Sequence, residues 1–83
     1  MDAQAFLTEL DELFELDAGT ITPADSIQEI PGWSSLTFMG LIALVDDELA
    51  ITLTPDTILR CRTVGELLRE VGIAQDNVGA RAA

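Results

Sequence analysis

Two adjacent serines, Ser34 and Ser35, lie between a turn signal at Pro31-Gly32 and a long apolar run that begins at Leu36. A serine before such a run is a good helix N-cap, because its hydroxyl accepts from the unpaired N–H groups of the first turn. Ser34 has the right spacing for that role. Ser35 then falls on the first turn, where a phosphate ester would meet unpaired N–H groups and the positive end of the helix dipole. The position therefore favours attachment of an anionic group.

The residues that are missing limit the chemistry. The chain has no histidine and no lysine, and its single cysteine is Cys61. Without a histidine, a Ser–His or Cys–His nucleophile pair cannot be built, and the usual His/Cys zinc sites are excluded as well. One cysteine forms no internal disulfide, so we expect Cys61 to be a small, partly buried side chain in a reducing compartment.

The composition is strongly acidic. Asp and Glu number 15 against 4 arginines, and the net charge is −11. An acidic domain repels phosphate backbones, so binding to nucleic acid is not expected. The same field attracts basic protein surfaces and accelerates encounters with them, which makes basic partner proteins the natural expectation.

The length of the chain bounds the kind of site it can build. Its 83 residues suffice for one small domain with a thin core, so an active site enclosed on all sides is not expected. The longest nearly apolar run, Leu36 to Val45, is too short to cross a membrane. The acidic start, Met1-Asp2-Ala3-Gln4, lacks the basic segment of a signal peptide. We therefore expect a cytoplasmic protein without membrane insertion.

The spacing of apolar residues predicts the elements that position the two serines. An amphipathic helix is predicted over residues 2–16, with Asp2 at its start and Gly19 just past its end. Its acidic side chains, including Asp11, are expected outside the apolar face. A connection over residues 17–33 follows, and a structureless loop of that length is uncommon in a compact domain and often functional. Three isoleucines are expected to pin it to the core: Ile21, Ile27 and Ile30.

Three further helical segments are predicted. The helix over residues 34–50 is apolar on more than one side, so we expect one face in the core and another against a partner. The core face comprises Phe38, Leu41, Ile42, Val45 and Leu49, and the other face Leu36, Met39, Gly40, Ala43 and Asp47. A short helix is predicted to begin at Thr54-Pro55-Asp56, and a last one, ending near residue 71, at the capping box Thr63-Val64-Gly65-Glu66. The domain is expected to span residues 1–75, with a flexible tail over residues 76–83.

Together these features resemble an acyl carrier protein over roughly residues 3–72. The resemblance is carried by Trp33-Ser34-Ser35-Leu36, Asp46-Asp47-Glu48-Leu49, Ile51-Thr52-Leu53 and Thr63-Val64-Gly65-Glu66-Leu67. It implies an all-α fold, a small four-helix bundle with a long first loop and a short third helix. It also implies that Ser35, which precedes Leu36, carries 4′-phosphopantetheine derived from coenzyme A. The thiol of that arm would hold acyl or aminoacyl groups as thioesters.

The resemblance further implies a monomeric carrier, not an enzyme, in a multi-enzyme pathway. A phosphopantetheinyl transferase would attach the arm, and acyl-loading and acyl-processing enzymes with basic docking surfaces would bind the carrier. Fatty-acid, polyketide, lipopolysaccharide-related and amino-acid-loading carriers share these features, so the pathway stays open. Two alternatives also stay open: a carrier-like adaptor that is never modified and, least favoured, a small enzyme that uses Ser35 or Cys61 directly.

The sequence departs from the family's pattern at three positions. Ser34 falls where the family usually has an Asp that helps contact the transferase, and Thr37 and Gly40 fall where acidic residues are frequent. These departures favour a specialised pathway over housekeeping fatty-acid synthesis. Docking is then expected to use the acidic end of the helix together with an apolar patch. The expected partner-binding residues are Ser34, Leu36, Met39, Gly40, Ala43, Asp46 and Asp47.

Overall fold

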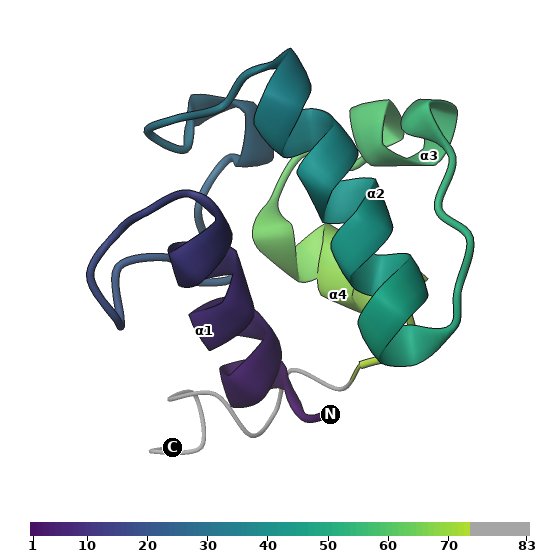
Figure 1. Ribbon diagram of the computed structural model, residues 1–83, viewed down its shortest axis with the longest axis horizontal. Helices are drawn as coiled ribbons and strands as arrows, with labels where there is room; N and C mark the ends of the chain where they lie inside the picture. Colours follow the sequence, from purple (N-terminus) through teal and green to yellow (C-terminus); the bar gives the residue numbers. More distant parts are fainter. Residues whose placement is uncertain (74–83) are drawn as a thin grey trace.

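The computed structural model describes residues 1–73, and the expected domain end at residue 75 and tail over residues 76–83 lie outside this range. Five helical elements follow one another: α1 (Ala3–Leu13), the 3-10 helix η1 (Ile27–Glu29), α2 (Ser35–Leu49), α3 (Pro55–Arg60) and α4 (Val64–Glu70). Short α3 lies beside the N-terminal half of α2 (Figure 1). The structure thus confirms a small all-α bundle with a long first loop and a short third helix.

One hydrophobic core joins the helices and the long loop. Helices α1 and α4 bury most of the face that their apolar spacing predicts, because residues three and four apart lie on one side of a helix. The three loop isoleucines are buried too, which confirms that the loop is pinned to the core. The most buried large side chains include Phe6, Leu10, Ile27, Leu41, Val45, Ile58, Val64, Leu67 and Leu68. On α2, the predicted core residues Phe38, Ile42 and Leu49 are only partly buried against this core.

Helix α1 ends earlier than the spacing predicts. Its last helical residue is Leu13, and Glu15 takes the left-handed conformation with φ of 59°. The N–H of Leu16 donates to the carbonyl of Asp11 at 2.8 Å, a bond that closes a Schellman-type helix end. The predicted end at residue 16, marked by Gly19, is therefore wrong. Gly19 has φ of 85°, but it lies in the following turn and not at the helix end.

Asp11 is buried, although the spacing predicts it outside the apolar face. Its side chain is 1% exposed. The carboxylate accepts from the N–H groups of Gly19 at 2.9 Å and Ile21 at 3.0 Å. A buried carboxylate needs such donors to offset the loss of its hydration. Because both donors belong to the loop, Asp11 fastens the first part of the loop to α1.

The second part of the loop is fastened to the start of α4. The N–H of Val64 donates to the carbonyl of Asp25 at 3.0 Å, and the N–H of Gly65 donates to the carbonyl of Pro23 at 2.9 Å. An isolated antiparallel bridge between Ser26 and Thr63 runs beside these bonds. Residues 19–26 of the loop are therefore held by α1 on one side and by the start of α4 on the other.

The capping box predicted at the start of α4 is only half formed. The N–H of Glu66 donates to Thr63 Oγ1 at 3.1 Å, as predicted. The carboxylate of Glu66, however, accepts from the N–H of Arg62 at 2.7 Å and not from that of Thr63. The carboxylate of Glu66 thus caps the residue before Thr63, and the reciprocal bond of the box is not formed.

The end of α2 gives a stability prediction. Ala50 is exposed and left-handed with φ of 56°, a conformation that is unfavourable for a residue with a Cβ and free of that cost for glycine. We expect Ala50→Gly to raise the free energy of unfolding by up to about 1 kcal/mol. The matched variant Ala43→Gly, in the exposed middle of the same helix, should lower it by about 1 kcal/mol. Urea denaturation measures both, and shifts of the same sign would contradict the prediction.

Candidate functional site

Helix α2 begins where the sequence predicts, with Ser34 as its N-cap. Ser34 Oγ accepts from the N–H of Thr37 at 3.3 Å, and Thr37 Oγ1 accepts from the N–H of Ser34 at 2.8 Å. The pair forms a reciprocal capping box in which a threonine takes the place of the usual Glu or Gln. The cap at Ser34 was predicted from the sequence but its partner Thr37 was not, although the Ser-x-x-Thr spacing indicates it.

Ser35 differs from its neighbour in that its hydroxyl is free. It is the first residue of α2, it is exposed, and its side chain makes no hydrogen bond within residues 1–73. Ser34 is also exposed, but its hydroxyl is engaged in the helix cap. The N–H of Thr37 is taken by the cap, but the N–H groups of Ser35 and Leu36 have no intrahelical carbonyl to donate to and make no hydrogen bond within residues 1–73. An ester of a phosphate on Ser35 therefore fits this helix start.

Trp33 anchors the chain immediately before the two serines. Its ring stacks on Phe14, with centroids 6.2 Å apart and an interplanar angle of 17°. It also meets Phe38 edge to face, with centroids 5.6 Å apart and an angle of 70°. Phe14 ends α1 and Phe38 belongs to α2, so the two contacts tie the end of the long loop to both helices.

A shallow hollow of about 180 Å³ adjoins the serines. It is lined by Trp33, Ser34, Ser35, Phe38 and Leu59. Leu59 comes from α3 and is 56% exposed, which is high for a leucine. The root of a group attached to Ser35 would thus meet an apolar surface shared by α2 and α3.

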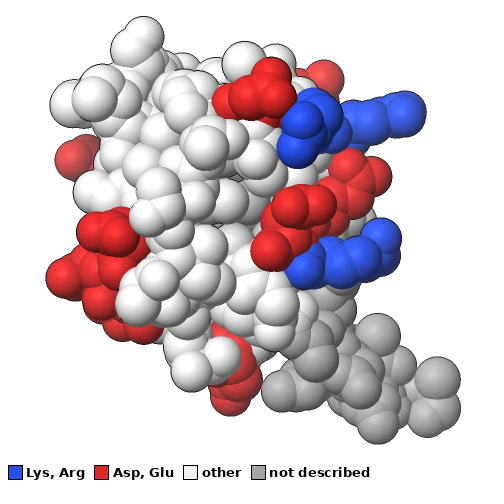
Figure 2. Space-filling model, turned by 90° about the vertical axis from the view of Figure 1, so that its right-hand side faces the viewer, with Lys and Arg blue, Asp and Glu red and all other residues white. Residues whose placement is uncertain are grey.

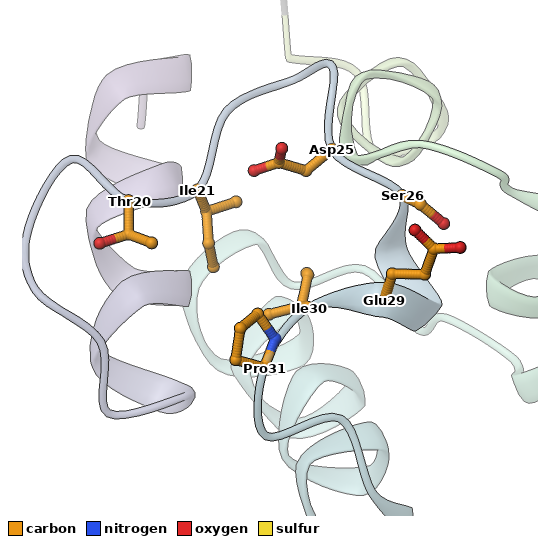
Figure 3. Close-up of a pocket in the computed structure, with 7 residues that line it drawn as sticks. All are labelled: Thr20, Ile21, Asp25, Ser26, Glu29, Ile30 and Pro31. Carbon is orange, nitrogen blue, oxygen red and sulfur yellow. The ribbon is translucent and has the colours of Figure 1, made fainter.

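A larger pocket of about 290 Å³ lies in the loop between α1 and α2 (Figure 3). Its lining comes from the loop alone and includes the carboxylates of Asp25 and Glu29. One Asp25 oxygen already accepts from the N–H of Thr22 at 2.9 Å. Neither Ser34 nor Ser35 lines this pocket, so it is separate from the two serines.

The exposed face of α2 is apolar near Ser35 and acidic at the far end. Leu36 is 81% exposed and Met39 68%, and Ala43 is exposed one turn further on. No charged residue occurs between Ser35 and Val45. The last turns then present three exposed carboxylates: Asp46, Asp47 and Glu48. The structure thus places six of the seven expected partner-binding residues on the exposed surface of α2 or its cap.

Gly40, the seventh, is half-buried against α1. A Cβ at this position would lie 2.8 Å from Leu13 Cδ1. The absence of a side chain at Gly40 therefore leaves room for the Leu13 side chain of α1. This contact explains a glycine in the interior of a helix by packing within the domain, a reason that the sequence alone does not reveal.

The charges of α3 and α4 are mixed. All arginines within residues 1–73 lie at positions 60, 62 and 69. Arg60 pairs with Asp56 at 2.9 Å, but both side chains are exposed, so the pair contributes little to stability. Basic and acidic side chains alternate over one side of the molecule, whereas acidic side chains without basic neighbours lie on the other (Figure 2). The side with acidic side chains alone should therefore attract a basic partner more strongly than the side with mixed charges.

Cys61 is buried at the end of α3, which confirms the expectation of a structural side chain. Burial raises the pKa of its thiol above the ordinary value of 9.0, and the carboxylates of Glu70 and Glu66 raise it further. A buried thiol that resists ionisation is a poor nucleophile. Direct catalysis by Cys61 therefore finds no support in this environment.

The raised pKa of Cys61 predicts a pH dependence of stability. Above pH 9.0 the unfolded chain loses the thiol proton of Cys61 while the folded chain keeps it. The contribution of the buried, protonated thiol to stability is therefore complete below that pH and is lost as the pH rises toward the folded pKa. The chain has no Lys, Tyr or His that would titrate in this window. Urea denaturation at pH 8 and pH 10 measures this effect. The free energy of unfolding should decrease between the two pH values in the unmodified protein, and it should decrease less in Cys61→Ala. An equal drop in both would contradict the assignment.

Residues 1–73 contain no group of three or more side chains that could hold a metal ion. Over that range, too, every helix is too short or too polar to cross a bilayer.

An all-α bundle with a pinned first loop and a free serine at the start of α2 defines a carrier-type domain. The family model described as the phosphopantetheine attachment site matches residues 4–71. The chain therefore belongs to this family, in agreement with the resemblance to acyl carrier proteins. Members carry covalently attached 4′-phosphopantetheine, and their carrier domains are generally non-catalytic. No curated protein and no solved structure is significantly similar to the chain.

Proposed function

We propose that this chain carries acyl or aminoacyl intermediates as thioesters on a 4′-phosphopantetheine arm attached to Ser35. It delivers them to the enzymes of a multi-enzyme pathway and catalyses no reaction itself. One observation carries the proposal. Of two adjacent exposed serines at the start of α2, only Ser35 has a hydroxyl that makes no hydrogen bond within the described residues.

Attachment requires little from the carrier itself. Ser35 Oγ attacks the phosphorus of coenzyme A that bears the pantetheine, a new P–O bond forms, and the bond to the adenosine bisphosphate leaving group breaks. The serine proton passes to a base of the transferase. The carrier thus supplies the nucleophilic oxygen and the unpaired N–H groups of the first turn. It needs no base of its own, which is in keeping with the lack of histidine.

Intact-protein mass spectrometry tests the proposal. The chain is incubated with coenzyme A, Mg²⁺ and a broad-specificity phosphopantetheinyl transferase, and a gain of one phosphopantetheinyl group is expected. If nothing is gained, the protein is isolated from its native cells and weighed. An unmodified mass there as well would contradict the carrier function and favour the adaptor interpretation.

We also propose that partner enzymes dock on the exposed face of α2. The apolar patch of Leu36, Met39 and Ala43 lies next to the attachment serine and suits a partner's apolar contact. Asp46 lies 11 residues beyond Ser35, which at 1.5 Å per residue is about 16 Å along the helix. A partner would therefore place basic residues about 16 Å from the entrance to its active site, for electrostatic complementarity.

Charge reversal tests the acidic part of this surface. The double variant Asp46→Lys/Asp47→Lys should lower kcat/KM of the transferase about tenfold at low salt, mainly through KM, because steering charges act on encounter. The matched control Glu12→Lys/Asp17→Lys changes the net charge equally at exposed positions on and after α1. Steady-state kinetics at low and high salt measure both. Equal kcat/KM for the two double variants would refute docking through the end of α2.

The proposal also covers the kind of pathway, the cellular location and the oligomeric state. Ser34, Thr37 and Gly40 stand where acidic residues are usual or frequent, which supports a specialised pathway over housekeeping fatty-acid synthesis. Free, buried Cys61 suits a reducing compartment and thus a cytoplasmic location. We expect a monomer, which light scattering of the purified chain would measure.

A further inference from the structure

The hydroxyl of Thr37 joins the turn before α2 to its first turn. Thr37 Oγ1 accepts from the N–H of Ser34 at 2.8 Å. Its own proton lies within donor distance of two carbonyl oxygens, that of Gly32 at 3.0 Å and that of Ser34 at 3.2 Å. One side-chain oxygen thus connects residues 32, 34 and 37.

Gly32 is itself held in place. It is left-handed with φ of 95°, and a Cβ there would lie 3.4 Å from the carbonyl oxygen of Phe14. The turn therefore passes close to the end of α1 before it meets Thr37. The bridge through Thr37 connects this anchored turn directly to the helix start.

Ser35 lies within the bridged segment. Its side chain makes no hydrogen bond within residues 1–73, so the direction of its Oγ depends on the backbone on either side. Two bonds that hold this backbone use the Thr37 hydroxyl. The reciprocal bond from the N–H of Thr37 to Ser34 Oγ is long, at 3.3 Å. Its acceptor is an uncharged hydroxyl, so the bond is weaker than one to a charged cap. The start of α2 therefore relies on Thr37 more than on Ser34.

We infer that Thr37 is a positioning residue for attachment of the arm, because its hydroxyl holds the segment from Gly32 to Thr37 so that Ser35 Oγ meets the transferase in one geometry. The inference rests on the proposed function. In-line attack needs the serine oxygen aligned with the bond that breaks, and a misplacement of about 1 Å can slow such a step about a hundredfold. Thr37 does not touch coenzyme A in this view; it acts through the position of Ser35.

Three variants separate positioning from general stability. Thr37→Val keeps the shape of the side chain and removes the hydroxyl, whereas Thr37→Ser keeps the hydroxyl. Thr57→Val is the matched control, since Thr57 occupies the third position of α3. Its hydroxyl lies 2.9 Å from Thr54 Oγ1, and its N–H donates to the same oxygen at 3.2 Å. The control thus removes a comparable hydroxyl at a helix start away from Ser35.

Steady-state kinetics of arm transfer, with the full chain as the varied substrate, gives the readout. Thr37→Val should lower kcat about tenfold and leave KM within about twofold, because positioning acts on the chemical step after docking. Thr37→Ser should restore kcat to within about twofold of the parent, and Thr57→Val should leave it unchanged. The double variant Ser34→Asp/Thr37→Val should also recover, since a charged cap holds the helix start without Thr37. Circular dichroism at the assay temperature checks that every variant is folded.

Each other outcome overturns the inference. An unchanged kcat in Thr37→Val shows that the bridge does not matter, and an equal loss in Thr57→Val shows a general effect of stability. A rise in KM alone shows that Thr37 contacts the transferase. A parent chain that takes up no arm, and that also carries none when isolated from its native cells, contradicts the proposed function and the inference with it. A parent chain that takes up the arm no faster than Thr37→Val contradicts the inference only.

Discussion

Replacing Ser35 with alanine is expected to abolish arm attachment, whereas replacing Ser34 with alanine is expected to preserve it. The Ser35 hydroxyl is exposed and makes no hydrogen bond within the described residues, so it is the oxygen available for the new ester. Ser34 instead uses its hydroxyl to accept from the N–H of Thr37. Intact-protein mass spectrometry after treatment with coenzyme A, Mg²⁺ and the transferase measures the gain, and peptide mapping locates it.

The two variants should rank in the opposite order for stability, with Ser34→Ala having the larger effect. Ser34→Ala removes the N-cap of α2 and should lower the free energy of unfolding by about 1 kcal/mol. Ser35→Ala removes no hydrogen bond within residues 1–73, so the change should stay within about 0.5 kcal/mol. One serine is thus predicted to matter for chemistry and the other for the helix. An arm found on Ser34, or a Ser35→Ala chain that still gains it, would show that the wrong serine was assigned.

Replacing Asp11 with alanine is expected to lower the free energy of unfolding by about 3 kcal/mol or more. The side chain is 1% exposed, and its carboxylate accepts from two backbone N–H groups of the loop. Each bond to a charged acceptor contributes about 1.5–3 kcal/mol, and removing the acceptor leaves the buried N–H of Ile21 without a partner. The free energy of unfolding of a domain is only about 5–15 kcal/mol, so a small domain would lose a large share of its stability.

Two control variants make the Asp11 prediction specific. Asp11→Asn keeps one acceptor oxygen but turns an NH₂ group toward an N–H donor, so we expect a loss of about 2 kcal/mol. Glu12→Ala removes the neighbouring carboxylate, which is exposed, and should change stability by less than about 0.5 kcal/mol. Urea denaturation compares the three. A loss for Asp11→Ala no greater than that for Glu12→Ala would mean that the buried bonds do not hold the loop.

The helix starts were predictable from the sequence because a cap is a local structure. Asp2, Ser34, Thr54 and Thr63 each accept from the N–H three residues further on, as their spacing indicates. Such a bond depends only on residues within one turn, so no knowledge of distant segments is needed. For the same reason the order of the helices and the position of Ser35 on the first turn of α2 could be predicted.

Apart from the local cap partner Thr37, the features below that the sequence did not reveal depend on contacts between distant segments. Asp11 lies in an acidic stretch of α1 and is indistinguishable from its exposed neighbours until the loop returns to it. Gly40 resembles an unfavourable residue in a helix until α1 packs against it, where a Cβ would lie 2.8 Å from Leu13 Cδ1. Helix α1 ends at Leu13 because the chain turns toward this loop, although the apolar spacing continues beyond it.

The sequence by itself determined a small acidic helical bundle and a serine at a helix start that is suited to an anionic ester. Only the tertiary structure decided how that serine is presented. Trp33 reaches Phe14, the residue that follows α1, from the end of the loop, and the turn at Gly32 passes beside the same residue. The reason is physical: hydrogen bonds within a turn are set by near neighbours, whereas the path of a long loop is set by the side chains and backbone groups it meets when the helices pack.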